Sequence, residues 1–265
     1  MKLTILQIDE VEPAPEHAGP VTVTGLRSSR LMSPRDHSLF LCIAEVDAGA
    51  TLTWPAHHAD EALYVFSGEL DVDGHRCPAG GAVIVESDVP ARVTATTPSR
   101  IGHFGSWDPA PPPGPTGAPA AEGHGVHVVG PRGIAAFGDP ETVGARFFGD
   151  ARCDTCRLSL FEVTRAHPRA GRPHSHSADE IIYILDGTMH LGANELHGGA
   201  ALSIPGQVRY AEGSGDDGCV FLNFRREVSD RTDFVKGQPP VTTLEQAGAS
   251  PDLRREDDVV DVLFA

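Results

Sequence analysis

The chain has 265 residues, of which 40% are apolar and 22% charged, the composition of an ordinary soluble globular protein. Its 21 basic and 37 acidic residues give a net charge of −16, which argues against nucleic acid or an anionic membrane as a partner. No apolar run approaches the roughly 18 residues that span a bilayer, and Met1–Glu10 lacks the pattern of a signal peptide. The five cysteines are an odd number and thinly spread, so we expect a reducing, cytoplasmic location.

Short alternating or apolar segments dominate the first half of the chain, and helical periodicity is scarce. Glycine, proline and aspartate turns separate these segments, and this spacing is typical of an all-β sandwich or barrel. The expected strands are Val21–Thr24, Ser38–Val46, Ala62–Phe66, Ala82–Val85, Arg92–Ala95 and Arg100–Phe104.

A stretch rich in proline and glycine, 108–124, divides the chain near its middle and predicts a stiff, extended linker. The halves on either side repeat one pattern: the spacing from Glu61 to Gly68 in the first half equals the spacing from Glu180 to Gly187 in the second. We therefore expect two copies of one β unit.

The second copy carries the most informative motif, His174-Ser-His176 followed by Glu180. Two histidines two positions apart on a strand point to the same face, and a glutamate four residues later has the same parity if the chain stays extended. Two imidazoles and a carboxylate suit a divalent transition metal with open coordination positions. His174, His176 and Glu180 are therefore the predicted metal ligands.

These residues resemble the first motif of the cupin superfamily, Gly-x5-His-x-His-x3/4-Glu-x6-Gly, with Pro168 in place of the leading glycine. The second motif, Gly-x5-Pro-x-Gly-x2-His, is matched by Gly199 and Pro205, with Gly206 one place early and Tyr210 in place of the final histidine. The resemblance implies an all-β bicupin of two tandem double-stranded β-helix (jelly-roll) barrels. The expected divisions are an N-terminal cupin over 1–107, the linker over 108–124, a C-terminal cupin with the metal site over 125–228 and a tail over 229–265.

Tyr210 is the departure from the family pattern that bears on chemistry, and three interpretations are open. It is an anionic fourth metal ligand, which requires the metal to depress a phenol pKa that is normally about 10. It is instead a hydrogen-bond donor to substrate or to a bound oxygen species, or a catalytic acid or base. In the third interpretation the early Gly206 shifts the strand, and Tyr210 only packs. In the first two cases the histidines and Glu180 form a set with open positions, as in non-haem iron oxygenases.

Four further residues of the second copy are candidates for binding substrate. Ile182 and Ile184 share the parity of Glu180, so we expect them to wall the pocket. Asn223 and Arg225 alternate on the last core strand, and they either enter the pocket as substrate anchors or lie on the solvated face.

The first copy has a damaged pocket. Alignment on Glu61 places Pro55, His57 and Arg92 at the positions of the second copy's two histidines and tyrosine. A guanidinium at a ligand position repels a cation, so Arg92 is expected to pair with Glu61 instead. We therefore expect a metal-free barrel that supports the second one.

The resemblance implies a metal-dependent enzyme that acts on a small-molecule substrate. The first hypothesis is an Fe(II) dioxygenase acting on keto-enol or phenolic compounds. The second is a redox-neutral isomerase, cyclase or lyase that uses Zn, Ni or Mn as a Lewis acid, and the third is a non-catalytic bicupin that binds a small ligand. A homodimer joined through sheet edges is also expected.

Overall fold

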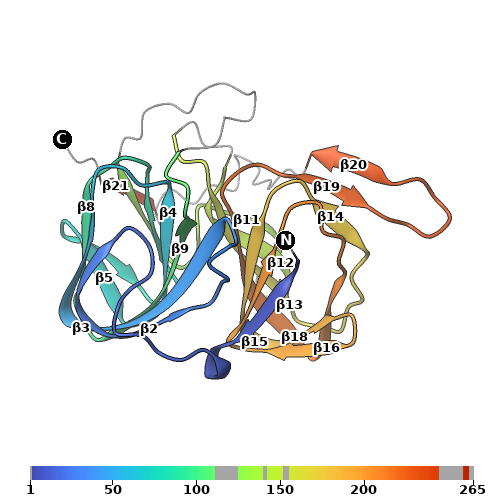
Figure 1. Cartoon of the computed structure of the whole chain (residues 1–265), viewed down its shortest axis with the longest axis horizontal. Coiled ribbons are helices and arrows are strands. Elements are labelled where there is room, and N and C mark those ends of the chain that lie inside the picture. Colours follow the sequence, from blue (N-terminus) through green and yellow to red (C-terminus); the bar gives the residue numbers. More distant parts are fainter. Residues whose placement is uncertain (1, 111–124, 140–141, 152–154, 245–258, 263–265) are drawn as a thin grey trace.

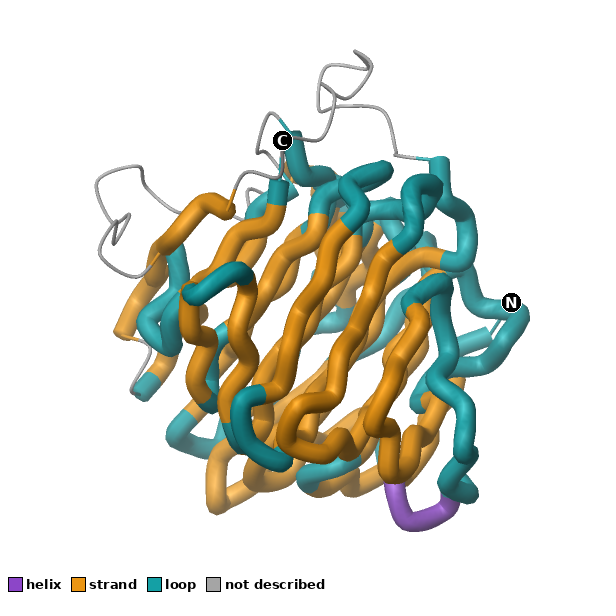
Figure 2. The backbone as a smooth tube through the Cα atoms, turned by 90° about the vertical axis from the view of Figure 1, so that its left-hand side faces the viewer, coloured by secondary structure: helices purple, strands orange, loops and turns teal. Residues whose placement is uncertain are grey.

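The structure is a computed structural model that describes residues 2–110, 125–139, 142–151, 155–244 and 259–262. They form two β-barrels side by side, which confirms the predicted fold (Figure 1). The helical structure among these residues is one 3-10 turn, η1 over Ile8–Glu10. Figure 2 shows strands that run side by side, with the loops gathered at their ends. Most of the predicted linker lies outside the described residues.

The strands fall into three sheets. The first sheet contains β2 Thr22–Leu31, β3 Leu39–Trp54, β4 Glu61–Ser67, β5 Glu69–Val72, β6 His75–Pro78, β7 Ala82–Val85, β8 Ala91–Ala95, β9 Ser99–Ser106, β10 Val126–Val129 and β21 Val259–Val262. The second contains β1 Thr4–Gln7, β11 Ala135–Asp139, β12 Val143–Gly149, β13 Ser159–Arg165, β15 Glu180–Leu191, β16 Asn194–His197, β17 Ala200–Ile204 and β18 Glu212–Arg225. The third contains β14 His174–His176, β19 Asp230–Asp233 and β20 Val241–Leu244.

Strand order defines the two larger sheets. The first sheet runs β21-β10-β7-β4-β9-β3-β8-β5-β6, with β2 paired to β3. The second runs β1-β17-β15-β18-β13-β12-β11, with β16 paired to β15. All six strands expected in the first half are present as β2, β3, β4, β7, β8 and β9.

Each barrel contains strands that lie outside its expected domain boundaries in the sequence. The N-terminal strand β1 pairs with β17 of the second barrel, with Thr4 opposite Ser203, and it lies in the right-hand barrel of Figure 1. In return β10, which follows the linker, pairs with β7 of the first barrel, and β21 of the tail pairs with β10. These additions cover sheet edges that would otherwise expose unpaired backbone groups.

Three apolar clusters hold the molecule together. One fills the first barrel, another fills the second, and the third lies between them and includes Tyr64, Phe104, Tyr183 and Phe224. Alternate residues of one strand serve two clusters, which is why β4 and β15 read as continuous apolar runs. The Phe104 and Phe224 rings lie 5.5 Å apart across the boundary between the barrels.

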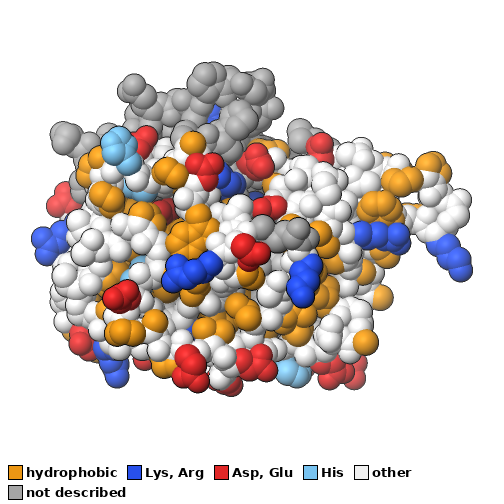
Figure 3. Space-filling model, viewed as in Figure 1, with side chains coloured by type: hydrophobic (Ala, Val, Ile, Leu, Met, Phe, Trp, Pro, Cys, Tyr) orange, Lys and Arg blue, Asp and Glu red, His pale blue; other side chains and the backbone are white. Residues whose placement is uncertain are grey.

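The surface charge and the cysteines are the remaining features of the fold. Basic side chains on the face in Figure 3 are scattered single groups. Among the described residues, no helix has the length and apolar character to cross a membrane. Cys42, Cys77 and Cys219 are buried free thiols, and Cys156 is buried as well.

Candidate functional site in the C-terminal barrel

The predicted motif residues converge at one end of the second barrel. His174 and His176 lie on β14 with 2% and 4% of their surface exposed, and Glu180 begins β15 fully buried. The histidine rings lie 4.9 Å apart, because alternate strand residues share a face. The three side chains therefore face one region, but strand parity explains only the two histidines, because bends at 177–178 separate β14 from β15.

The turn before β18 brings Tyr210 into the same region. Gln207 has a φ of +66°, the left-handed conformation that the motif normally gives to glycine. The chain therefore has a left-handed residue at the position where the motif has glycine, although the glycine stands one place early, at Gly206. The backbone of Tyr210 pairs with His174 through two hydrogen bonds of 2.8 and 2.9 Å, and their rings lie 4.5 Å apart.

Glu180 is the centre of a buried hydrogen-bond network. The Tyr210 hydroxyl donates to its Oε1, and Asn223 Nδ2 donates to its Oε2 at 2.9 Å. Arg225 donates to Oε2 from Nε at 3.2 Å and from Nη2 at 3.0 Å. Asn223 and Arg225 thus face the pocket, although their contacts in this structure are with Glu180.

The network fixes the charge of its members. Burial alone would raise the pKa of Glu180, but the nearby Arg225 guanidinium and the hydrogen bonds from Tyr210 and Asn223 hold it below its usual value. Burial and the Glu180 and Glu212 carboxylates raise the pKa of Tyr210 well above its usual value. Glu180 is therefore an anion and Tyr210 a neutral donor at neutral pH.

Hydrogen bonding also fixes the tautomers of both histidines. Arg225 Nη2 lies 3.2 Å from His176 Nε2, and because arginine only donates, this nitrogen is an acceptor. His174 Nδ1 lies 2.8 Å from the Arg172 carbonyl oxygen, so Nδ1 carries the proton and Nε2 keeps its lone pair. Burial lowers the pKa of His174, although the Arg172 carbonyl and Glu212 act against this.

Glu212 and Arg165 belong to the cluster but were not predicted. Glu212 Oε2 lies 3.7 Å from His174 Nε2, and Arg165 donates to Glu212 Oε1. Glu212 follows Tyr210 by two positions at the start of β18, so its parity with Tyr210 was the available signal. Arg165 comes from β13, and nothing in its local sequence indicates this partner.

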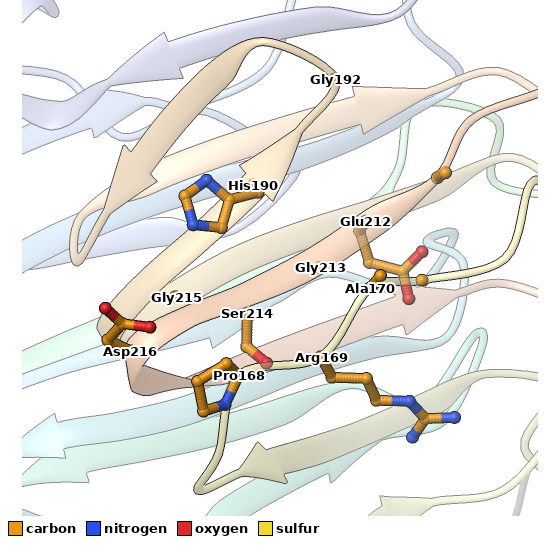
Figure 4. Close-up of a pocket in the computed structure, with 12 residues that line it drawn as sticks. Pro168, Arg169, Ala170, His190, Gly192, Glu212, Gly213, Ser214, Gly215 and Asp216 are labelled. Atoms are coloured by element: carbon orange, nitrogen blue, oxygen red, sulfur yellow. The ribbon is translucent and has the colours of Figure 1, made fainter.

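A cleft of about 520 Å³ lies on the outside of the cluster, and Glu212 is one of its lining residues (Figure 4). Arg169, His190, Ser214 and Asp216 supply its other polar side chains. Several glycines line the rest, so backbone is exposed to any molecule that binds there. Glu212 therefore borders both this cleft and the buried cluster, where its buried Oε2 faces His174.

The prediction that two apolar residues of β15 face the interior of the second barrel agrees with the observed packing. Ile182 and Ile184 are 1% and 0% exposed and belong to the interior cluster of the second barrel, which also contains Tyr210. Tyr183 faces the opposite way, into the cluster between the barrels. The role of Ile182 and Ile184 in binding substrate stays a prediction.

A divalent ion does not fit the predicted ligand set in this arrangement. Three side chains already donate to the Glu180 oxygens, and Arg225 Nη2 lies within 3.2 Å of both His176 Nε2 and Glu180 Oε2. Metal ligands lie about 2.0–2.3 Å from an ion such as zinc, so an ion shared by these two atoms would overlap the guanidinium. No His, Cys, Asp and Glu group of three within the described ranges has metal-site geometry. The metal assignment stays a prediction that requires Arg225 to move.

The equivalent pocket of the first barrel is closed by a different network. Glu61 Oε2 lies 2.6 Å from Trp54 Nε1 and 2.6 Å from His103 Nε2, and His103 Nδ1 lies 2.8 Å from His17 Nε2. The expected pairing of Arg92 with Glu61 is wrong, because Ala91 faces inward on β8 and Arg92 is exposed.

His57 also lies outside that pocket, with 89% of its side chain exposed beside Asp88. Its φ of +81° marks the turn that directs it away from the barrel.

Comparison with known proteins supports the fold. No protein-family model and no curated protein matches the chain. Among solved structures, oxalate decarboxylase of Lactobacillus farciminis in a formate complex is 14% identical with a TM-score of 0.61, covering 84% of this chain and 86% of that one. A Bacillus subtilis oxalate decarboxylase variant is 13% identical with a TM-score of 0.58, covering 86% and 78%.

An 11S globulin shares the same fold. Procruciferin, the 11S globulin of Brassica napus, is 9% identical with a TM-score of 0.58, covering 88% of this chain and 86% of that one. The fold of the chain is therefore that of the two-barrel cupin proteins. Because enzymes and 11S globulins both adopt it, the fold does not identify the function, which depends on the site.

Proposed function

We propose that the C-terminal barrel is the active site of a redox-neutral enzyme, an isomerase or lyase, that moves a proton on a small polar substrate. The observation that carries the proposal is the pair formed by His174 Nε2 and Glu212 Oε2, two acceptors 3.7 Å apart in a buried position. The Arg172 carbonyl holds the His174 proton on Nδ1, so Nε2 is available to accept another.

The acceptors of the cluster define the substrate class. Glu212 Oε2 and Asn223 Oδ1 are buried and have no hydrogen-bond partner in the described part of the chain. A buried acceptor without a donor is costly, and hydroxyl or amine groups on a ligand would remove that cost. A small hydroxyl- or amine-bearing molecule that enters from the Glu212 cleft fits this requirement.

Each residue then has a role. His174 Nε2 accepts the substrate proton, and Glu212 stabilises the imidazolium that forms. Tyr210 is protonated at neutral pH and acts as the acid: its hydroxyl gives a proton to the substrate, and the neighbouring His174 imidazolium then returns a proton to the Tyr210 phenolate. Ile182 and Ile184 limit access of water on the apolar side.

The test is solvent deuterium exchange. The purified protein, kept in a chelator, is incubated in D2O with pooled hydroxy acids, hydroxy ketones, sugars and amino alcohols, and exchange is followed by proton NMR. We expect exchange into at least one compound, lost in His174→Ala and Glu212→Gln and retained in the exposed controls His197→Ala and Glu195→Gln. Exchange that survives in His174→Ala contradicts the proposal. Compounds that raise the melting temperature without exchanging would favour the non-catalytic bicupin instead.

A metal-dependent enzyme is the second candidate, because the His174 tautomer and the His-x-His-x3-Glu spacing are those of a metal ligand set. It includes the Fe(II) dioxygenase and the Zn, Ni or Mn isomerase expected from the sequence. Elemental analysis of protein purified without added metal distinguishes the two candidates. One equivalent of iron, together with oxygen uptake on a diketone or catechol, would replace the first proposal with the oxygenase.

A further inference from the structure

Arg225 stands where the sequence motif would place a cation. Its guanidinium donates twice to Glu180 Oε2 and lies 3.2 Å from His176 Nε2. These are the lone pairs that a metal ion would need from Glu180 and His176. Arg225 is also fixed from its other side, since its guanidinium lies 5.7 Å from the centre of the Phe161 ring.

The ligating atoms themselves are close enough to share an ion. His176 Nε2 and Glu180 Oε1 lie 4.0 Å apart, and two ligands of one ion at about 2.0–2.3 Å can be separated by up to twice that length. His174 faces the same region with Nε2 unprotonated. What prevents binding is therefore the guanidinium, which takes the space and adds a like charge in a buried site.

We propose that Arg225 supplies the cation of this site in place of a metal ion, and that the chain keeps a latent His174–His176–Glu180 metal site which loss of the guanidinium opens. The inference goes beyond the proposed function and shares with it only the location of the cluster. It means that one side chain separates the metal-free site from a metal-binding cupin site.

The experiment compares metal binding by three proteins with their full chains: wild type, Arg225→Gln and Arg226→Gln. Arg226 is a matched control, because it bonds Ser106 and lies near Asp108, outside the cluster. Each protein is treated with a chelator, dialysed and titrated with Co2+, whose visible absorption reports nitrogen and oxygen ligation. Bound metal and melting temperature are measured in parallel.

We expect substoichiometric Co2+ binding by wild type and Arg226→Gln, with no change in melting temperature. Arg225→Gln should bind close to one equivalent, develop the ligand-field absorption and gain thermal stability. The added change His176→Ala should remove this binding. If Arg225→Gln folds only when refolded with Co2+, that dependence also shows that the variant binds the ion and supports the inference.

Two outcomes overturn the inference. One is stoichiometric binding by wild type that is lost in His174→Ala or His176→Ala, because the guanidinium would then not exclude the ion. The other is an Arg225→Gln protein that binds no Co2+, or that fails to fold with Co2+ present. Neither outcome alters the exchange assay in chelator, so the proposed function is judged separately.

Discussion

Glu61, at the centre of the first barrel's network, makes stability depend on pH in a way that one substitution removes. Burial raises the pKa of Glu61 from 4.5 to about 7, although the hydrogen bond from Trp54 and nearby His58 act against this. The folded protein therefore holds a proton at this site that the unfolded chain releases. Stability from this group is present below about pH 4.5 and is lost as the pH rises through about 7.

The size of the effect follows from the shift. One pKa unit corresponds to about 1.4 kcal/mol, so between about pH 5 and about pH 8 Glu61 should cost the wild type about 2 to 3 kcal/mol of unfolding free energy. Glu61→Gln lacks the titration and should not pay this cost. Burial lowers the pKa of both His17 and His103 to about 3, with the opposite pH dependence, but both residues remain in the variant.

Urea unfolding of wild type and Glu61→Gln across this pH range measures the difference directly. Glu61→Gln should gain stability relative to wild type as the pH rises, while Glu195→Gln, at an exposed position, should follow wild type. A constant difference between wild type and Glu61→Gln would refute the assignment of a raised pKa to Glu61.

Three further predictions follow from packing and hydrogen bonding. Removal of residues 2–7 takes β1 from the edge of β17 and should lower the unfolding free energy by about 3 kcal/mol in urea titrations, because Leu3, Ile5 and Leu6 pack into two apolar clusters. Unchanged stability would contradict the pairing of β1 with the second barrel. Phe224→Ala should cost about 3–5 kcal/mol in the same assay, since the ring is fully buried between the barrels; a cost below about 1 kcal/mol would contradict that packing. Tyr210→Phe should stay folded with about 1–2 kcal/mol lost, and should abolish deuterium exchange; retained exchange would remove Tyr210 from the chemistry.

Much of the fold was predictable because strands and turns leave local patterns in the amino-acid sequence. Apolar runs between turns predicted the strands, and the repeated spacing from glutamate to glycine predicted two barrels. The exchange of β1, β10 and β21 was not predictable, because pairing at a sheet edge depends on backbone groups that carry no sequence signal. Short strands such as Thr4–Gln7 also lack enough periodicity to show where they pair.

The site, like the fold, could be predicted only in part. Strand parity predicted that His174 and His176 share a face, with Glu180 beside them if the chain stays extended, and it left open whether Asn223 and Arg225 enter the pocket. It could not show that Arg225 lies between His176 and Glu180, since that depends on how two distant strands are placed. In the first barrel, alignment assigned Arg92 to the pocket, but a one-residue difference in β8 turns Ala91 inward and Arg92 outward.

The most direct test of the central claim is the tautomer of His176, measured by long-range 15N–1H NMR on protein labelled at histidine. We predict a neutral ring with the proton on Nδ1 and with Nε2 as an acceptor, unchanged when excess Zn2+ is added, because Arg225 holds that lone pair. A shift of the Nε2 resonance on adding one equivalent of Zn2+, with the matching change in His174, would contradict this account and restore the metal-dependent one.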